Sequence, residues 1–383
     1  MMTVWVLGLL GCIGPWPSSK AIEEPQVGFL YRGPVNDMGW TMSHEVGRAE
    51  LEAAIPTAST HVMAGVTPSD AIDVIGRFIE NGDNVIVGTS EDFGPALRAA
   101  ALDHPDVRFL SCGSFDEAAN LGSFAGRLYQ TKYLAGLLAA SSSCTGRIGY
   151  VASVSNPESV RQINAFTLGA RAIDPNAIVL VSWVGVRWSV DLETAATERL
   201  LTAGIDVLTS GTDTAVPIEV ANGRAATCGN DEVAVQTIGH GYTGACEGAG
   251  AGCLAVTAFE WGPVYVDLLE DMQAGVWVPD GDRWDGVQST PEQGVVQLAS
   301  LDPLVATATR VEVEFEAAQL GDTRPLATPF VGPLSDTMGM ERVAAEAVLS
   351  DVGLRSMCWF VDGVRDVTAP DDPQTSVPAP CSP

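Results

Sequence analysis

The chain has 383 residues, 46% of them hydrophobic, and its formal net charge at pH 7 is -28. This length is long for one hydrophobic core and favours two lobes. The strong negative charge excludes nucleic acid as a partner, and it excludes binding to anionic lipid through a basic patch, because phosphate groups would be repelled. No apolar run in the sequence is long enough to span a bilayer.

The N-terminal residues carry an export signal. Residues 1–11 predict a signal peptide, because an apolar run is followed by a small residue, Gly11, directly before Cys12. The run LLGC that ends at Cys12 matches a bacterial lipobox. We therefore expect Cys12 to be acylated and 12–26 to form a flexible tether, so that the protein is anchored in the cell envelope and faces the periplasm. The alternative is an ordinary signal behind a misplaced start codon, since the first residues contain no Lys or Arg.

The first part of the chain alternates short apolar strands with helical segments. Strands are expected at Val27–Tyr31, Thr60–Ala64, Val85–Gly88 and Val107–Ser111, and helices at Ser43–Ala54, Ser69–Asn81, Pro95–Asp103 and Tyr129–Ser142. Gly136 inside the last helix predicts a close packing contact, because glycine there costs about 1 kcal/mol relative to alanine. The alternation is typical of a parallel sheet covered by helices on both faces.

A second series of strands and helices begins at Arg147. The expected strands are Ile148–Ala152, Ile178–Val184, Val207–Ser210, Gln236–Gly239 and Leu254–Ala258, and the expected helices are Pro157–Ile173, Leu192–Ala203, Val216–Gly223 and Trp261–Gln273. The pattern of Gly294–Val364 predicts mixed strands and turns with one helix at Glu341–Asp351. Residues 367–383 are rich in Pro, Asp and Ser, which predicts disorder.

Polar or aromatic residues follow several of these strands where each strand ends. Asn36, Asp37 and Trp40 follow the first strand, and Asp213 lies at the end of a strand in the second series. Ligands bind outside the carboxyl ends of strands in open α/β sheets, so these residues are candidate ligand contacts. The structural alternatives are that Asp37 caps a helix and that Trp40 fills the core.

Seven cysteines remain besides Cys12. None of them forms a CxxC motif or a His/Cys cluster, so no zinc site is expected. Export favours disulfides, and the candidate pairs are Cys246 with Cys253 and Cys358 with Cys381. Because seven is odd, at least one thiol stays free or pairs elsewhere. The alternative is that these cysteines are small buried hydrophobic residues.

The ordered set of motifs resembles the basic membrane protein family, the purine-nucleoside-receptor-like lipoproteins that bind solutes for ABC importers. The matching segments, in order, are VGFLYRGPVNDMGW, GRLYQTKYLAGLLAA, RQINAFTLGAR, the Trp188 loop, TDT at 212–214, AFEWGPVYV and WFVDGV. They extend from about residue 26 to 365. The resemblance implies a type I periplasmic-binding-protein fold with two Rossmann-like α/β lobes and three crossover strands. The expected lobes are 27–146 with about 258–295, and 147–257 with about 296–366.

The resemblance also implies a set of ligand contacts in the cleft between the lobes. A purine pocket needs aromatic faces for stacking and a carboxylate or amide that reads the ring edge. The positions that match the family's pocket are Trp40, Asn36, Asp37, Ser90, Phe93, Tyr129, Gln130, Trp188, Asp213, Glu260 and Trp261. Trp188 and Trp261 have a structural alternative as core residues, and Glu260 has one as a helix cap.

One position departs from the family. Relatives usually carry an Asp after the strand that corresponds to Gln236–Gly239, and that residue suits a ribose; here the sequence continues His240-Gly241-Tyr242-Thr243. The departure favours a free purine base or an altered ligand over a full nucleoside, and the choice between base and nucleoside stays open.

The expected function is therefore a substrate-binding component of an ABC importer that captures a purine base or nucleoside and delivers it to a permease and ATPase. A lipid-anchored sensor for a signalling receptor is an alternative that the sequence does not separate from the first. An enzyme is less favoured, because the chain has no GxSxG, GxxxxGK[ST] or HExxH motif and no GxGxxG after a strand. No cofactor or metal is expected.

Overall fold

The computed structural model describes residues 20–116, 118–247, 250, 252–280, 283–287, 295–321, 328–368 and 381. The predictions for the signal peptide and for Cys12 lie outside these residues. Within the described part of the chain, no helix combines the length and the apolar character that a membrane crossing needs.

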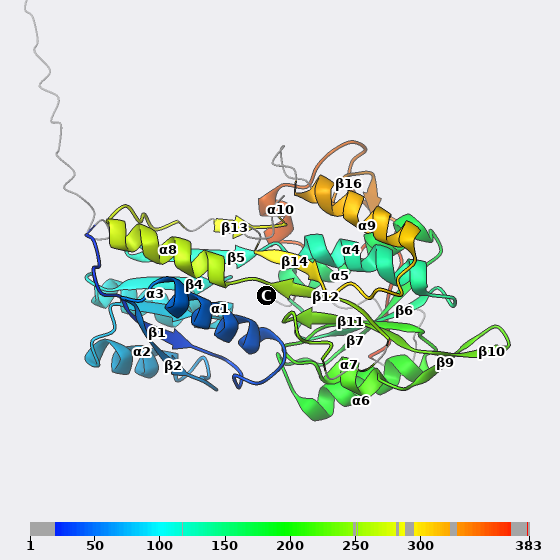
Figure 1. Cartoon of the computed structure of the whole chain (residues 1–383). Helices are drawn as coiled ribbons and strands as arrows, with labels where there is room; N and C mark the ends of the chain where they lie inside the picture. The colour runs from blue at the N-terminus through cyan, green and yellow to red at the C-terminus, as the bar shows by residue number, and fades with distance from the viewer. Residues whose placement is uncertain are drawn as a thin grey trace, which may run out of the picture.

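The first sheet has six strands in its described part, in the order β13–β5–β4–β3–β1–β2, and all of its strand pairs are parallel (Figure 1). Its strands are β1 (Gln26–Leu30), β2 (Ser59–Met63), β3 (Val85–Gly88), β4 (Arg108–Cys112), β5 (Leu121–Gly126) and β13 (Arg283–Asp285). The inner strands are apolar runs because helices cover both of their faces. The four strands expected here are confirmed, whereas β5 and β13 were not predicted.

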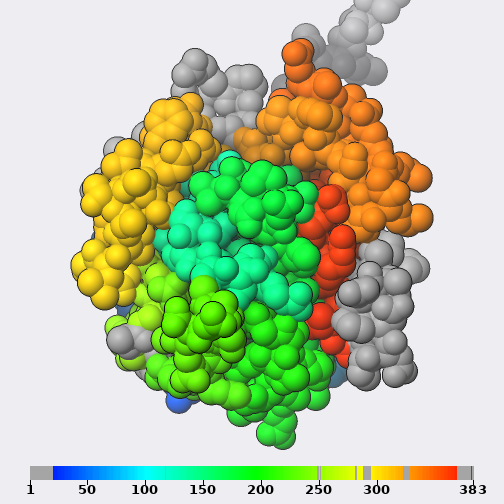
Figure 2. All heavy atoms as spheres, turned by 90° about the vertical axis from the view of Figure 1, so that its right-hand side faces the viewer, coloured from blue at the N-terminus to red at the C-terminus, as the bar shows by residue number. Residues whose placement is uncertain are grey.

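The second sheet has the strand order β14–β12–β11–β8–β6–β7–β17 among the described residues, and only β14 runs antiparallel to its neighbour. Its strands are β6 (Arg147–Ala152), β7 (Ile178–Trp183), β8 (Val207–Gly211), β11 (Gln236–Gly241), β12 (Cys253–Phe259), β14 (Val296–Ala299) and β17 (Val364–Asp366). Figure 2 views this end of the molecule, where the C-terminal segment (red) lies along the second lobe. Two small antiparallel pairs are β9 (Ala225–Cys228) with β10 (Asp231–Ala234), and β15 (Leu334–Ser335) with β16 (Glu341–Val343).

The helices of the described residues pack on the two sheets or on one another. They are α1 (Trp40–Ala54), α2 (Ala71–Glu80), the 3-10 helix η2 (Glu91–Phe93), α3 (Gly94–Asp103), α4 (Leu128–Ser142), α5 (Pro157–Ile173), α6 (Val190–Thr202), α7 (Val216–Ala221), α8 (Gly262–Ala274), α9 (Thr307–Leu320) and α10 (Asp351–Arg355). The helices predicted before residue 274 are confirmed within a few residues at each end.

The chain passes between the two sheets three times. It leaves the first sheet after β5, returns after β12 into α8, which packs on α1, and leaves again between β13 and β14. Helix α4, at the first crossing, packs closely on α5 and faces the second sheet. A Cβ at Gly136 would lie 2.0 Å from the Phe166 carbonyl oxygen, which confirms the close contact predicted there. We therefore propose that the first lobe boundary lies near residue 127, and not at 146.

One prediction for the C-terminal part of the chain is wrong, and the bounds of two others are corrected. The helix predicted at Glu341–Asp351 is absent, because Glu341–Val343 forms β16, and the long helix of this region is α9. The tether predicted over 12–26 is not free over its described residues, since the Ile22 amide donates to the Met272 carbonyl (3.0 Å). Most of 367–383 lies outside the described residues, but Thr368 Oγ1 accepts from the Trp183 amide (2.8 Å), so disorder does not begin at 367.

Three disulfides join described cysteines. Cys246 is bonded to Cys253 and Cys358 to Cys381, as the sequence indicated, and a third bond joins Cys144 to Cys228. The two cysteines of the third pair lie 84 residues apart in the sequence, so no local sequence pattern indicates that they are bonded. Cys112 is the free cysteine among the described residues, and it is buried.

Candidate functional site

The two lobes touch where the β1–α1 loop of the first lobe meets the β8–α7 loop of the second. The Trp40 backbone amide donates to the Asp213 carbonyl (3.0 Å) across this boundary. A Cβ at Gly39 would lie 2.2 Å from the same oxygen, so only glycine allows this approach. The lobes are therefore closed on each other at this edge of the cleft.

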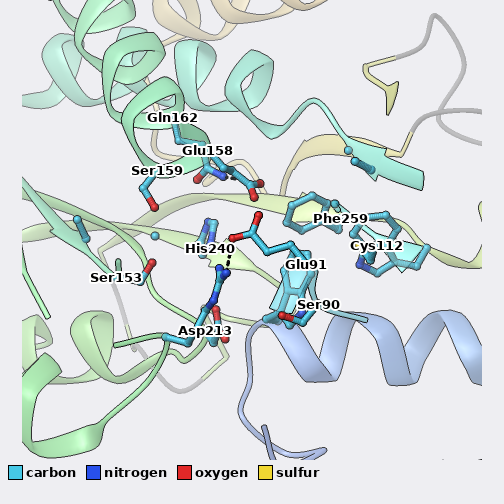
Figure 3. Close-up of a pocket in the computed structure, with 18 of the residues that line it drawn as sticks. Ser90, Glu91, Cys112, Ser153, Glu158, Ser159, Gln162, Asp213, His240 and Phe259 are labelled. Atoms are coloured by element: carbon cyan, nitrogen blue, oxygen red, sulfur yellow. Dashed lines mark hydrogen bonds and ion pairs between the residues drawn. The ribbon is translucent and has the colours of Figure 1, made fainter. Parts of the chain in front are cut away.

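A cavity lies behind that contact, between the carboxyl ends of the strands in both sheets (Figure 3). We call it the inter-lobe pocket. It spans about 740 Å³ when the open solvent at its mouth is counted. Its lining residues are Trp40, Ser90, Glu91, Cys112, Gly113, Ala125, Gly126, Tyr150, Ala152, Ser153, Glu158, Ser159, Gln162, Arg187, Gly211, Asp213, His240, Phe259 and Trp261.

The first-lobe side of the pocket is an aromatic wall. Trp40 meets the edge of Phe259 with ring centroids 5.1 Å apart, and Phe259 stacks on Trp261 at 4.8 Å. Behind them, Trp261 stacks on the buried His44 at 4.6 Å. The indole Nε1 of Trp40 donates to the Thr89 carbonyl (2.8 Å), which fixes the ring. This wall offers a preorganised surface for a flat, apolar ligand face.

The second-lobe side of the pocket is polar. Figure 3 shows Glu158 and Gln162 reaching into the cavity from α5, with Asp213 and His240 on other sides of it. Burial raises the pKa of Asp213 to about 7, although Arg187 opposes this shift. Burial also raises the pKa of Glu158 and, together with the nearby Lys132, holds the pKa of His240 well below its usual range. The wall can therefore both accept and donate hydrogen bonds at neutral pH.

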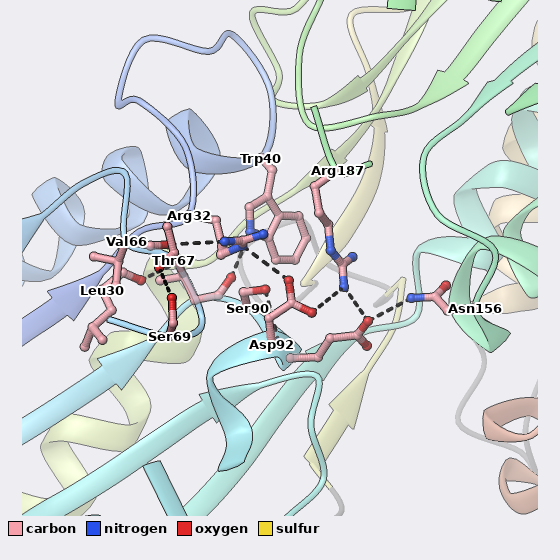
Figure 4. A network of polar contacts seen from close by, with 12 residues as sticks. Leu30, Arg32, Trp40, Val66, Thr67, Ser69, Ser90, Asp92, Asn156 and Arg187 are labelled. Carbon is pink, nitrogen blue, oxygen red and sulfur yellow. Dashed lines mark hydrogen bonds and ion pairs between the residues drawn. The ribbon is translucent and has the colours of Figure 1, made fainter. Parts of the chain in front are cut away.

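A network of charged residues connects the lobes beside the pocket (Figure 4). Arg187 of the second lobe pairs with Glu91 and, at 3.3 Å, with Asp92 of η2 in the first lobe. Asn156 of the second lobe donates to Glu91 Oε1 (2.8 Å), and Arg32 pairs with Asp92 (3.2 Å). Burial lowers the pKa of Arg187, but Glu91, Asp213 and Asp92 outweigh it, so the pKa is raised. This inter-lobe latch holds the cleft closed.

The structure brings four of the sequence-predicted contacts to the pocket: Trp40, Ser90, Asp213 and Trp261. Glu260 lies on a neighbouring cavity behind the aromatic wall, where it accepts from Gln297 Nε2. Burial and the charge of Glu50 raise the pKa of Glu260.

The other predicted contacts lie elsewhere. Asn36 is exposed, and the Asp37 carboxylate accepts from the amides of Gly39, Thr41 and Met42, as a helix cap does. Phe93 is fully buried among α2 and α3 side chains. Tyr129 packs on Trp284 and Phe330, and Gln130 accepts from the Val287 amide (2.8 Å). Trp188 is 42% exposed and does not line the pocket.

Several pocket residues were not predicted, chiefly Glu91, Glu158, Gln162, Arg187 and His240. Glu91 and Arg187 are direct neighbours of the predicted Ser90 and Trp188, so the loops were identified but the residues that face the cavity were not. Glu158 and Gln162 lie four residues apart in the first turns of α5, after the end of β6. The strand-end rule, applied to that segment, would have found them.

Comparison with known proteins agrees with this geometry. The model of the family of PnrA-like ABC transporter substrate-binding proteins matches residues 24–222. A purine-binding protein of Brucella abortus is 30% identical over 355 residues, which cover 91% of this chain and 95% of that protein. A protein of Haloferax volcanii named as an ABC transporter glucose-binding protein is 28% identical, over 78% of this chain and 72% of that protein.

The fold is also found in solved structures. An ABC transporter solute-binding protein from Conexibacter woesei superimposes with a TM-score of 0.59 at 21% identity, covering 77% of this chain and 96% of that chain. This likeness supports the fold alone, which is the type I periplasmic-binding-protein fold. The family is one of binding proteins, not of enzymes. The family match and the relative that covers most of the chain lead to one conclusion: this chain belongs to the PnrA-like family of ABC transporter substrate-binding proteins.

Proposed function

We propose that the protein captures a purine base or nucleoside outside the cytoplasm and delivers it to an ABC permease. The observation that carries the proposal is the pairing of an aromatic wall, formed by Trp40 and Phe259, with a wall that holds Asp213, Glu158 and Gln162. A purine has π-faces that stack on aromatic rings and ring-edge groups that donate and accept hydrogen bonds.

The charge of the pocket favours a ligand that donates hydrogen bonds. Asp213, Glu91 and Glu158 line it, and Arg187 is the one Lys or Arg among the described residues that do so. Because Arg187 already pairs with Glu91, the carboxyl groups of Asp213 and Glu158 are left to face the ligand. The exocyclic amine or ring N–H of a purine base fits such acceptors.

Ligand capture is coupled to closure of the lobes in this proposal. The latch between Arg187 and Glu91 and the backbone bond from Trp40 to Asp213 form only when the cleft is closed. A ligand that bridges the two walls binds the closed state more tightly and shifts the population toward it. The closed form is then the one that a permease recognises, with Cys12 as the proposed lipid anchor.

A thermal-shift screen tests the proposal. The protein is refolded to remove bound ligand and is mixed with adenine, guanine, hypoxanthine, their nucleosides, glucose and amino acids. A ligand at about 100 times its Kd adds about 2.7 kcal/mol to the free energy of unfolding, which raises Tm by several degrees. We expect purines to raise Tm and glucose and amino acids to leave it unchanged. A shift with glucose and none with any purine contradicts the proposal.

A further inference from the structure

His240 is a buried pocket residue to which the proposed function gives no role. It lies near the end of β11, is 6% exposed, and lines the inter-lobe pocket (Figure 3). Its Nδ1 contacts Thr257, and this is the one hydrogen bond that the ring makes among the described residues. Buried polar atoms normally have a partner, so the other ring nitrogen, Nε2, is available to a ligand.

The neighbouring strand determines which nitrogen of His240 carries the proton. His240 is paired with Thr257 of β12, whose Oγ1 lies 3.5 Å from His240 Nδ1. The Thr257 hydroxyl donates its single proton to the Gly239 carbonyl (3.1 Å), so toward His240 it acts only as an acceptor. Nδ1 is then the protonated nitrogen, and in a neutral imidazole Nε2 is a hydrogen-bond acceptor.

The surroundings of His240 keep its imidazole neutral. Burial, together with Lys132 of α4, holds the pKa of His240 well below its usual range. Burial also lowers the pKa of Lys132, but a charged Lys132 repels an imidazolium and a neutral one does not attract it. The carboxyl groups of Asp213 and Glu158 line the same pocket and attract a proton on His240 when they are ionised. Burial raises the pKa of both carboxyl groups, which weakens this attraction.

The His240 ring is held in place by both lobes. Its strand, β11, lies between β8 and β12 in the second sheet. A Cβ at the next residue, Gly241, would lie 3.1 Å from the Gly39 carbonyl carbon, so the first-lobe backbone packs against the end of the strand. His240 therefore has no room to move aside, and the ligand atom that faces Nε2 must carry a hydrogen and no larger substituent.

A free purine base has a donor that matches this acceptor. Every free base carries one N–H on its five-membered ring, at N9 or N7, whereas a nucleoside carries ribose at N9 and has no N–H on that ring. One neutral acceptor suits this single donor, while the carboxyl groups of Asp213 and Glu158 suit the donors on the six-membered ring.

We propose that His240 is a specificity-determining residue whose Nε2 accepts a hydrogen bond from the five-membered ring of a free purine base, and that Thr257 is its positioning residue. The proposal rests on the proposed purine function and narrows its ligand class from bases and nucleosides to free bases. A nucleoside leaves Nε2 without a partner, and a site with an unpaired buried polar group rejects such an analogue.

The first test compares adenine, 9-methyladenine, 7-methyladenine and adenosine by calorimetric titration of the wild-type protein at one pH. Both methylated bases keep the exocyclic amine and the ring faces but lack the N–H of the five-membered ring. Because the methyl group occupies a different position in each, the pair separates loss of the donor from a clash at one position.

Four variants accompany the wild type. His240→Phe keeps a buried ring without the acceptor, and His240→Gln offers a carbonyl acceptor in its place. Thr257→Val keeps the shape of the side chain but removes the acceptor for the Nδ1 proton. His104→Gln is the matched control, because His104 is an exposed histidine at the end of α3.

We expect the wild type to bind adenine at least about tenfold more tightly than either methylated base or adenosine, because each of these leaves a buried acceptor unpaired. This ratio should fall to about two or less in His240→Phe, be kept in part in His240→Gln, and stay unchanged in His104→Gln. Equal binding of all four ligands by the wild type overturns the role of His240 but leaves the purine function in place, as does an unchanged ratio in His240→Phe.

The protonation state of His240 is a second readout, and it is measured on the ligand-free protein as well. The chain has four histidines, so ¹⁵N-histidine labelling gives few NMR signals, and those of His240 are identified by their absence in His240→Gln. We expect the neutral Nδ1–H form at neutral pH, a shift of the Nε2 signal when adenine is added, and a mixture of tautomers in Thr257→Val. An imidazolium or an Nε2–H form in the presence of adenine overturns the proposal.

Failure of the purine function gives a different pattern. If none of the four purine ligands, guanine or hypoxanthine binds to the wild type, both proposals are wrong. If adenosine binds and adenine does not, the purine function stands and the role proposed for His240 is contradicted.

Discussion

The two walls of the inter-lobe pocket are built in different ways. On the first-lobe side, Trp40, Phe259 and Trp261 contact one another and the buried His44, and Trp261 is 1% exposed, so the wall is continuous with the core. On the second-lobe side, Asp213 and Arg187 come from loops, and Glu158 and Gln162 come from the first turns of α5. The aromatic wall is fixed by packing, whereas the polar wall is arranged by hydrogen bonds and by the latch.

The two walls are therefore expected to contribute differently to ligand recognition. Packing against a rigid aromatic surface stabilises any flat ring, whereas a polar wall distinguishes ligands by the donors and acceptors at their edges. We therefore expect changes on the aromatic wall to weaken all purines alike. Changes on the polar wall should alter which purine binds, and how binding depends on pH and salt.

The largest effect is expected for Trp40→Ala. Base–aromatic stacking contributes about 1–3 kcal/mol per base, so the affinity for purines should fall by about 5- to 150-fold, with little change in their order of preference. Calorimetric titration measures the affinities, and Trp40→Phe is the control that keeps an aromatic face. Unchanged affinity in the alanine variant would remove Trp40 from the ligand contacts.

The next effect is expected for Arg187→Gln, which breaks the latch to Glu91 and Asp92. The pair is partly exposed, so the loss should be about 1 kcal/mol, or about fivefold in ligand affinity, through weaker closure. The difference from wild type should shrink as salt is raised, because salt screens the latch. Titrations at low and high salt measure it, with Arg224→Gln as the charge-matched control. A loss that does not depend on salt would argue against an electrostatic latch.

The pH dependence of binding should follow Asp213. Its pKa is raised by burial from 3.8 to about 7, so between these values the folded protein holds a proton that the unfolded chain has lost. Because the unfolded chain ionises first, the free energy of unfolding of the ligand-free protein falls as pH rises through this range. A ligand N–H that donates to Asp213 favours the ionised form, so the affinity should rise by up to about tenfold per pH unit below pH 7.

Titrations from about pH 5 to pH 8 measure this trend, and Asp213→Asn should flatten it. Arg187, Asp37, Glu193 and Arg32 also act on Asp213, so Arg187→Gln should displace the profile along the pH axis. A wild-type affinity that does not change with pH would show that Asp213 does not accept from the ligand.

The smallest effect is expected for Trp188→Ala. Trp188 is 42% exposed and lies outside the pocket lining, although it directly follows Arg187. The affinity for purines should change by less than about twofold. A tenfold loss, measured by the same titration, would mean that the loop between β7 and α6 rearranges when the ligand binds.

The strands were predictable from the sequence where they are buried on both faces. Val85–Gly88 is a continuous apolar run and forms β3 within its predicted bounds. β5 was missed because Gly and Ser interrupt its sequence, LGSFAG, although the strand is nearly all buried. α9 was missed because only Val313 and Leu320 of its residues are buried, so its apolar pattern is weak.

The sequence predicted which loops form the candidate site, but it did not predict all of the side chains that line the pocket. Trp40, Ser90 and Asp213 lie at strand ends, where the rule for α/β sheets places ligands. In the β7–α6 loop the sequence pointed to Trp188, whereas the structure places Arg187 at the pocket. A loop has no side-chain period, so the sequence does not indicate which of two neighbours faces a cavity. A second cavity, which adjoins the inter-lobe pocket, is lined by residues of β5, α5, β13 and α10, and no local pattern connects these segments.

The most direct test of the account is a calorimetric titration of the refolded wild-type protein with purines and with glucose. The account predicts that at least one purine binds with 1:1 stoichiometry, and that glucose does not bind. Binding of glucose, with no heat from any purine, would contradict it and would assign the aromatic wall to a sugar ring.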